Sequence, residues 1–543
     1  MRWGATLLVP AMGLSSLFAS CRFEGDNAPV PARSPAPAPI ARPTVAPPPA
    51  PPPRAQATTP PPAPPPPLVV ASATPSEPTL PADLIEGPDD SEPEPEPIAR
   101  RGREADELAS TAKETWVYAE PRWSARRIGY LRAGAIVERA AEPASRASCA
   151  DGWYRVQPRG FVCVGSMATL DVHDAVVAAS SRRPSFDGLP YTYVMSRSPP
   201  PPLYARLPSE DEQAKLEPDL KQVIRAALRA HREPSFVEPP APDPLPSALL
   251  YGRPLPPLGN TWRSPDDLLV GRARGRSGFA LLSTFDHEGR RFGLTTELAV
   301  IPLDRTRVIR PSTFHGVKLD GALTLPIAFV RSRHAARFTD AGAGLLSRGA
   351  PLAFRDAVAL TGRVRLQSGA RYLEAKDGSF LREDESVRVD PPQHPPSWAT
   401  PGRRWIDVSI LRQALVAYEG TTPVYVTLVS TGADGVGDPK TTRSTIQGAF
   451  LIHTKHVTVT MDGDEREDQF DFRDVPFVQY FTEGFALHAA YWHDEFGTPR
   501  SHGCVNLAPI DAAWLFGWTG PEVPPGWHAA LTLKKGTLVH THP

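Results

Sequence analysis

Short runs in which apolar and polar residues alternate recur along the chain after residue 107, and this period of two is typical of β-strands. Between residues 107 and 172, runs bounded by Gly or Pro predict a small all-β barrel; they lie at 116–121, 128–137, 152–156 and 160–164. From Trp405 onward further runs predict a larger β domain over residues 403–543, at 405–410, 413–418, 424–429, 448–452 and 457–461. We therefore predict a mainly β protein.

The region between these domains, residues 173–402, has a weaker pattern. Residues 292–301 and 372–381 each have the rhythm of a strand, a turn and a second strand, whereas Leu220 to Leu228 has the spacing of a helix. The region contains no catalytic signature, and its charged residues are expected on solvated faces. We predict a β-rich middle region without chemistry of its own.

The amino-terminal part differs in composition. Of the 66 prolines, 26 lie between Pro29 and Pro97, and such a segment cannot bury enough apolar surface to offset its ordering entropy. Residues 21–106 are therefore predicted to be a disordered, extended tether. Residues 1–20 have the charged start and apolar run of a signal peptide, and their exit at Cys21 resembles the lipobox of bacterial lipoproteins. We expect an exported protein of the periplasm or cell envelope, with a lipid anchor at Cys21.

Charge excludes one class of partner. The chain has 59 basic and 60 acidic residues, a formal net charge of −1, and it lacks a block of clustered basic residues. Binding to phosphate backbones needs such clusters, so we expect no nucleic-acid partner.

The other cysteines divide into a candidate pair and a single thiol. Cys149 and Cys163 are 14 positions apart in the predicted barrel, and in an oxidising compartment a disulfide between them would contribute roughly 3 kcal/mol. Cys504 would then remain unpaired. A lone thiol in an exported protein suggests a nucleophile, which needs a base or cation nearby to form the thiolate.

Three histidines near Cys504 are candidates for that base: His488, His493 and His502. His488 closes a β-like run and is followed by a loop long enough to fold back toward the thiol. His502 is two residues from the cysteine in a tight turn. Gly503 permits an unusual backbone angle, so the amides of Gly503 and Cys504 are expected to converge on an oxyanion. The pattern indicates covalent acyl transfer.

The sequence Ser501-His502-Gly503-Cys504-Val505-Asn506, preceded by His488, resembles the active-site motif of the L,D-transpeptidase (YkuD-like) catalytic domain. The resemblance implies a β-sandwich over residues 403–543, with Cys504 as nucleophile and His488 as general base. It also implies that the carbonyl of Ala489 orients the imidazole, and that Ser501, His502 and Gly503 shape the catalytic loop. Asn506 is one of the two residues common at its position in the family. Because only residues 489–500 separate His488 from Ser501, a short spacing for this family, His493 is the alternative base.

The family resemblance implies a reaction on peptidoglycan stems that requires no cofactor. Cys504 would attack the diaminopimelate carbonyl of a tetrapeptide and release D-alanine, and the thioester would pass to an amine. The acceptor, whether another stem, an envelope protein, a D-amino acid or water, is left open. The barrel at 107–172 looks like a bacterial SH3-like domain, and one or two degenerate copies are expected within residues 173–402.

Two rival hypotheses remain. His488, His493, His502 and Cys504 are residue types that zinc prefers, although the tight turn crowds two of them; we expect no metal. Alternatively, the protein is a non-catalytic envelope lipoprotein whose SH3-like modules bind peptidoglycan. Aromatic residues after the motif are expected in the core or the cleft wall (Trp514, Phe516, Trp518 and Trp527), and His540 and His542 are expected in a frayed end rather than as a ligand pair.

Overall fold

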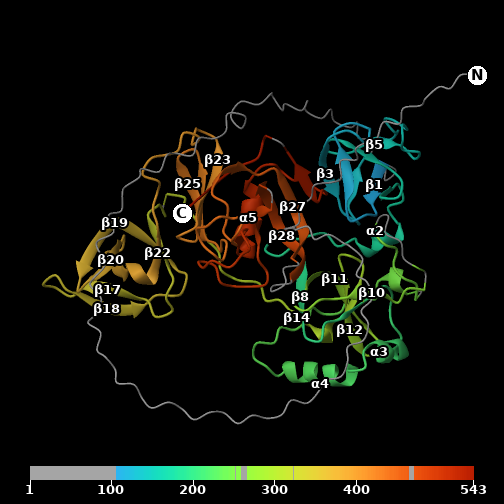
Figure 1. Cartoon of the computed structure of the whole chain (residues 1–543), viewed down its shortest axis with the longest axis horizontal. Coiled ribbons are helices and arrows are strands. Elements are labelled where there is room, and N and C mark those ends of the chain that lie inside the picture. Colours follow the sequence, from blue (N-terminus) through green and yellow to red (C-terminus); the bar gives the residue numbers. More distant parts are fainter. Residues whose placement is uncertain are drawn as a thin grey trace, which may run out of the picture. The chain divides into compact units, whose positions relative to one another are not determined.

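The computed structural model describes residues 106–543, except residues 251, 259–263, 265, 322, 464–469, 483 and 533 (Figure 1). The predicted signal peptide, Cys21 and the proline-rich tether lie outside the described residues. The described part is mainly β, as the alternating pattern predicts. Among its helices none combines the length and the apolar character needed to span a membrane.

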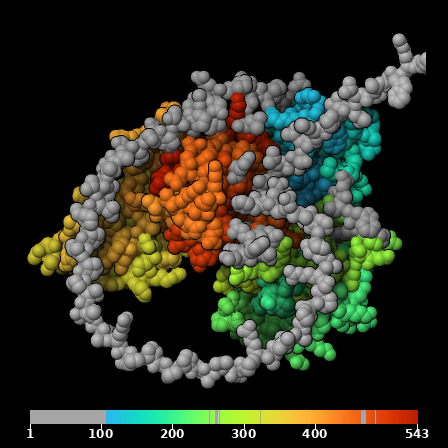
Figure 2. All heavy atoms as spheres, in the orientation of Figure 1, coloured from blue at the N-terminus to red at the C-terminus, as the bar shows by residue number. Residues whose placement is uncertain are grey.

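The first module is built from two small antiparallel sheets, with strand orders β4-β1-β7 and β3-β2-β6-β5. Their inward-facing residues, among them Leu108, Val117 and Val156, are fully buried in one core. Figure 2 shows the atoms of this module in blue. The strands are β1 (Glu107–Ser110), β2 (Thr115–Tyr118), β3 (Arg127–Leu131), β4 (Ile136–Glu138), β5 (Trp153–Arg155), β6 (Phe161–Cys163) and β7 (Ala168–Thr169).

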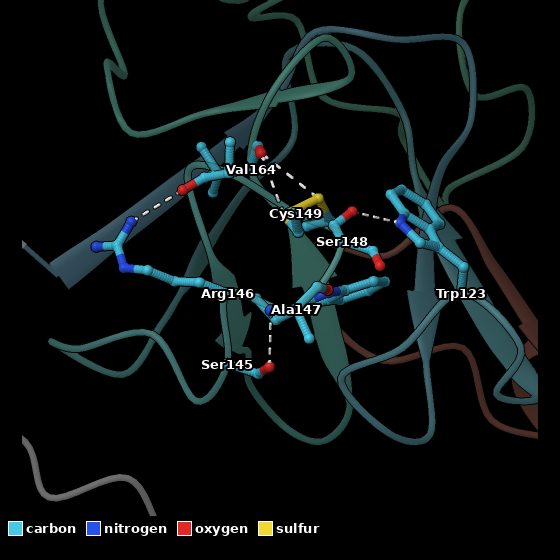
Figure 3. The surroundings of a disulfide bond; sticks show 10 residues. Trp123, Ser145, Arg146, Ala147, Ser148, Cys149 and Val164 are labelled. Atoms are coloured by element: carbon cyan, nitrogen blue, oxygen red, sulfur yellow. Dashed lines mark hydrogen bonds between the residues drawn. A yellow bond between two sulfur atoms is a disulfide. The ribbon is translucent and has the colours of Figure 1, made fainter.

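A disulfide joins Cys149 to Cys163 at the edge of the first module (Figure 3). It ties the loop before β5 to the end of β6, next to the fully buried Trp153. The indole of Trp123 donates a hydrogen bond to the carbonyl of Ser148 in the same loop, at 2.8 Å. The disulfide thus fastens a long irregular loop to the module.

Residues 189–309 form a second module, and residues 323–389 a third, with the same strand topology. In the second, β8 pairs with β11 and β14, and β9 pairs with β10 and β13. Its elements are β8 (Thr192–Ser196), β9 (Pro202–Tyr204), β10 (Leu269–Arg272), β11 (Gly278–His287), β12 (Arg290–Thr295), β13 (Val300–Pro302), the 3-10 turn η3 (Leu303–Arg305) and β14 (Thr306–Val308). An insertion between β9 and β10 carries α3 (Glu210–Leu216), α4 (Leu220–Ala230) and η2 (Ser247–Leu249), and α2 (Ala175–Ala179) precedes the module.

The third module repeats these pairings one for one: β16 pairs with β19 and β22, and β17 pairs with β18 and β21. Its elements are β16 (Ile327–Val330), β17 (Ala336–Asp340), β18 (Leu346–Pro351), β19 (Ala357–Gln367), β20 (Ala370–Ala375), β21 (Phe380–Arg382), η4 (Glu383–Glu385) and β22 (Ser386–Val389). The two strand-turn-strand runs noted in the sequence, 292–301 and 372–381, occupy equivalent places in the two modules. The middle region is therefore an internal structural repeat.

The carboxy-terminal domain has two sheets that enclose one helix. The six-stranded sheet has the order β15-β25-β24-β23-β32-β26, and the second sheet runs β31-β27-β28-β29-β30. Side chains of both sheets and of α5 share one core, which includes Val408, Phe477 and Leu515. The elements are β15 (Val317–Lys318), β23 (Arg404–Ser409), β24 (Ala414–Glu419), β25 (Thr422–Leu428), β26 (Gly448–Leu451), β27 (Thr454–Gly463), β28 (Phe470–Thr482), β29 (Phe485–Ala489), β30 (Val505–Leu507), α5 (Pro509–Trp518), β31 (Ala529–Leu531) and β32 (Leu538–His542).

The first module and the carboxy-terminal domain share a sheet, because β3 pairs with β31. Trp527 is buried in the core of the first module, and Gly129 lies beneath it. A Cβ atom on Gly129 would lie 2.4 Å from the carbonyl oxygen of Ala529, so the close approach of these strands requires glycine.

A buried ion pair reinforces this junction. Arg132, which follows β3, contacts Asp474 on β28, and both side chains are less than a tenth exposed. The Asp474 carboxylate also accepts hydrogen bonds from the hydroxyls of Thr458, at 2.7 Å, and Thr296 of the second module. The cluster therefore connects the first module, the second module and the carboxy-terminal domain through one carboxylate.

The prediction of a frayed end at His540 and His542 is wrong. Both residues belong to β32, which lies inside the six-stranded sheet between β23 and β26. The neighbouring Leu538 and Val539 are almost fully buried. Local sequence suggested fraying because parallel pairing with β23 depends on residues more than 130 positions earlier.

Candidate active site

A cavity of about 530 Å³ lies at one end of the second sheet and is lined by Cys504, His488, His493, His502 and Asn506. Ser501 also contributes to its wall. The motif residues that the sequence singled out thus meet at one hollow. Strand pairing explains this, because β29 and β30 run parallel with His488 in register with Asn506. Residues in register on parallel strands face the same side of the sheet.

Cys504 stands directly before β30 and is 7% exposed, and it is a thiol rather than part of a disulfide. Gly503, with φ of 126°, makes the turn into it; a Cβ there would lie 2.7 Å from the ring of Phe485. Glycine is therefore required at this position. The hydroxyl of Thr445 donates to the carbonyl of Gly503 at 2.7 Å and fixes the turn from the other side.

Ser501 makes two hydrogen bonds within this turn. The N–H of Gly503 donates to the hydroxyl of Ser501 at 3.1 Å, and that hydroxyl donates to the carbonyl of Cys504. Ser501 thus closes the turn as a local hydrogen-bonded ring. The convergence of the Gly503 and Cys504 amides on an oxyanion stays a prediction.

His488 is held in one tautomer by its own strand. Its Nδ1 lies 3.1 Å from the carbonyl oxygen of Ala489, which can only accept, so Nδ1 carries the proton. Nε2 is left with its lone pair. Burial lowers the pKa of His488 to about 4, although the hydrogen bond to Ala489 opposes this shift. The imidazole is therefore neutral at physiological pH and can accept a proton at Nε2.

His493, in contrast, has both ring nitrogens engaged. The backbone N–H of Glu495 donates to Nδ1 at 3.2 Å, so Nε2 carries the proton of the neutral ring. Nε2 lies 3.0 Å from the Asn506 amide nitrogen, and the Asn506 Oδ1 is buried without a hydrogen-bond partner among the described residues. Turning the amide by 180° lets Asn506 Oδ1 accept a hydrogen bond from the Nε2–H of His493. Burial lowers the pKa of His493 to about 4, and nearby positive charge adds to the shift.

The zinc hypothesis finds no geometric support at the cavity. Within the described ranges, the donor atoms of His488, His493, His502 and Cys504 do not form a group of three close enough to share an ion. The aromatic residues after the motif are not part of the cavity wall either. Phe516 packs in the core of the domain with Trp514 and Trp518 against it, and Trp527 packs in the first module.

Several residues of the cavity carry no signal in the sequence. Trp492 stacks on Phe472 with ring centroids 4.1 Å apart and forms one wall. Met195, on β8, and Arg276 come from the second module. Only the three-dimensional arrangement brings Met195 and Arg276 to Cys504, because both are distant from it in sequence and belong to no motif.

The loop that carries His493 is anchored by the third module. Both terminal nitrogens of Arg355 contact Asp494, one the carboxylate at 2.7 Å and one the backbone carbonyl at 2.6 Å. The guanidinium also lies over the ring of Phe314 at 5.1 Å, and the hydroxyl of Ser312 donates to the Asp494 carboxylate. Two hydrogen bonds from one planar group fix the loop in orientation as well as position.

We expect Arg355→Ala to slow acylation of Cys504 by about 10-fold, because a loosened loop displaces the wall formed by Trp492 and His493. Acylation can be followed by mass spectrometry with a carbapenem. The matched control is Arg363→Ala, which removes a largely exposed arginine of the same module that pairs with Glu374. Equal rates for both variants and the wild type would show that the anchor has no part in the site.

Residues 403–540 match the model of the YkuD family, described as the L,D-transpeptidase catalytic domain. The Bacillus subtilis (strain 168) protein named "Putative L,D-transpeptidase YciB" is 27% identical over 138 residues, which cover 21% of this chain and 59% of that protein. The chain thus spans less than two thirds of this relative. The carboxy-terminal region is therefore similar in sequence to L,D-transpeptidase catalytic domains.

Solved structures match this chain as well. A mutant of the Enterococcus faecium L,D-transpeptidase is 21% identical, with 26% of this chain and 50% of that chain covered and a TM-score of 0.20. An L,D-transpeptidase from Mycobacterium smegmatis is 17% identical, with 44% and 89% covered and a TM-score of 0.21.

Proposed function

We propose that this protein is a peptidoglycan L,D-transpeptidase in which Cys504 is the nucleophile and His488 the general base. The observation that carries the proposal is the shared cavity: the thiol and a neutral imidazole with its lone pair on Nε2 line the same hollow. Both residues lie in the segment that matches the L,D-transpeptidase family model.

In the first half-reaction, Cys504 Sγ attacks the diaminopimelate carbonyl of a tetrapeptide stem while its proton passes to His488 Nε2. The tetrahedral intermediate collapses, the C–N bond to D-alanine breaks, and the amine leaves with the proton from His488. A thioester remains. An amine then attacks the thioester, His488 accepts its proton, and the C–S bond breaks to regenerate Cys504. The energy of the peptide bond is conserved in the thioester, so the exchange requires no nucleotide.

The direct test is incubation of the full chain with purified tetrapeptide stems, followed by mass analysis of the products. We expect free D-alanine and cross-linked dimers. Addition of a free D-amino acid or an envelope-protein lysine peptide then identifies the preferred acceptor. Stems that remain intact, bound or unbound, would contradict the enzyme and favour the non-catalytic wall-binding hypothesis.

The two candidate bases can be separated by substitution. We expect His488→Asn to lower the rate of D-alanine release by about 100-fold or more, the usual contribution of a general base. His493→Asn should cost less than about 10-fold, because both nitrogens of His493 already make hydrogen bonds within the protein. Initial rates at saturating stem peptide measure both effects, and the opposite ranking would assign the base to His493.

The location of the protein belongs to the same proposal. Export, a lipid anchor at Cys21 and a proline-rich tether would place the domain at the cell wall, where its substrate lies. In this view the modules at 107–172 and within 173–402 are SH3-like, and they support the catalytic domain beside peptidoglycan.

A further inference from the structure

Three side chains on the outer face of the six-stranded sheet converge away from the catalytic cavity: Asp407, His540 and His542. His540 Nδ1 lies 2.9 Å from one carboxylate oxygen of Asp407, and His542 Nε2 lies 3.2 Å from the other. The donor atoms of all three lie within 4.8 Å of one another. Nothing in the transpeptidase chemistry uses this cluster.

Strand register produces the convergence. Asp407 on β23 is paired directly with His540 on the parallel strand β32, and Ser409 is paired with His542. Because side chains alternate along a strand, both histidines face the same side as Asp407. The main-chain hydrogen bonds of two neighbouring strands therefore hold the three groups in place, and no flexible loop contributes.

The donor set and its spacing suit a divalent metal ion of the zinc type. Zinc binds imidazole nitrogen and carboxylate oxygen at about 2.0–2.2 Å in tetrahedral geometry, which separates neighbouring donors by roughly 3.3 Å. The two nitrogen–oxygen distances are already close to this value. Each imidazole can present a lone pair to the ion by carrying its proton on the other nitrogen, and a fourth position would remain for water because the cluster is partly exposed.

Neighbouring side chains pack against the imidazoles of His540 and His542 and leave the space between the three donor atoms open. The two imidazoles lie nearly parallel with centroids 5.0 Å apart, and the edge of Trp398 meets His540 at 5.4 Å. The nearby positive charge of Arg412 would repel a metal ion at this cluster, but its guanidinium donates a hydrogen bond to the backbone carbonyl of Arg388. The carboxylate of Asp407 faces the cluster and offsets that charge.

We propose that Asp407, His540 and His542 form a zinc-type metal site that fastens the last strand of the catalytic domain to β23. The ion would replace two hydrogen bonds to one carboxylate by three coordinate bonds between the strands. It would act on stability and not on acyl transfer, since the cluster lies outside the cavity that holds Cys504.

The test uses the full chain without a histidine tag, in a Cys504→Ala background so that the catalytic thiol cannot bind metal. After chelation and dialysis, titration with Zn²⁺ alone should show one ion bound per chain and a higher melting temperature. We expect Asp407→Asn, His540→Ala and His542→Ala each to weaken binding at least 10-fold. The control, His334→Ala, removes an exposed histidine of the third module and should bind as the parent does.

A second measurement guards against variants that fold poorly. Co²⁺ in place of Zn²⁺ should give the visible absorption of a tetrahedral site in the parent protein and lose it in His542→Ala, whose circular dichroism is compared with that of the parent. Failure of the parent to bind Zn²⁺, or binding that persists in all three ligand variants, would overturn the proposal. Neither result would bear on the transpeptidase activity, which is assayed in the chain with Cys504 intact.

Discussion

Replacing Cys504 by alanine should reduce D-alanine release by roughly four orders of magnitude, the scale expected when a covalent nucleophile is removed. Without Sγ no thioester forms, and the remaining groups of the cavity can only bind and orient the stem. The measurement pairs product release with the mass of the intact protein. The wild type should gain the mass of an acyl group from a carbapenem, and Cys504→Ala should gain none.

The substitution is conservative for the fold, because alanine removes one largely buried atom beside Met461 and Ala486. The melting temperature of Cys504→Ala should therefore stay near that of the wild type. The control is Ser347→Ala, which removes an exposed hydroxyl of the third module and should keep full activity. Acylation that continues in Cys504→Ala would place the nucleophile elsewhere and refute the proposed function.

Replacing Asp474 by asparagine should destabilise the protein by about 3–5 kcal/mol, because it leaves the charge of Arg132 buried without its partner. The measurement is the midpoint of urea unfolding followed by tryptophan fluorescence. Glu120→Gln, which breaks the exposed pair between Glu120 and Arg122, is the control and should leave the midpoint of unfolding near that of the wild type. A double variant, Arg132→Met with Asp474→Asn, should recover part of the loss. Equal midpoints for Asp474→Asn and the control would contradict a structural role for the pair.

The same carboxylate predicts a dependence on pH. Burial raises the pKa of Asp474, but the charge of Arg132 and hydrogen bonds from Thr296, Thr458 and Arg132 outweigh it and hold the pKa well below its usual range. Since the folded pKa is the lower one, the pair stabilises the protein above the unfolded value of about 3.9, and this contribution is lost as the pH falls toward the folded pKa. The difference in free energy of unfolding between the wild type and Asp474→Asn should accordingly become smaller below about pH 4.

The features predicted correctly from the sequence, strands and the motif around Cys504, depend on residues that are neighbours in the chain. The strands β23 to β27 were predicted within a few positions, because alternation is a local pattern. The motif at 501–506 identified Cys504. His488, which the family resemblance implied as the base, and the alternative His493 both line the cavity of that thiol. These inferences succeed because each depends on residues close together in the chain.

What the sequence could not predict depends on distant partners. The strand β28 was missed, because Pro476 and the charged residues Arg473 and Asp474 are unusual in a buried strand. The buried Asp474 carboxylate is paired with Arg132, some 340 positions earlier, and sequence alone does not show this pairing. The anchor at Arg355 and the wall residues Met195 and Arg276 were missed for the same reason. His540 and His542 were misplaced because their partner, Asp407, is 133 and 135 residues away.

The strand β15 has a practical consequence for anyone who wishes to isolate the catalytic unit. Val317 and Lys318 precede the matched segment 403–540 by more than 80 residues, yet they pair with β25 as the edge of its sheet. A fragment cut at residue 403 would expose the backbone of β25 to intermolecular pairing. It would also lack the second module, which contributes Met195 and Arg276 to the cavity, and the third module, whose Arg355 anchors the loop of His493. Such a fragment is expected to aggregate, and a soluble catalytic unit must begin well upstream of the boundary that sequence comparison suggests.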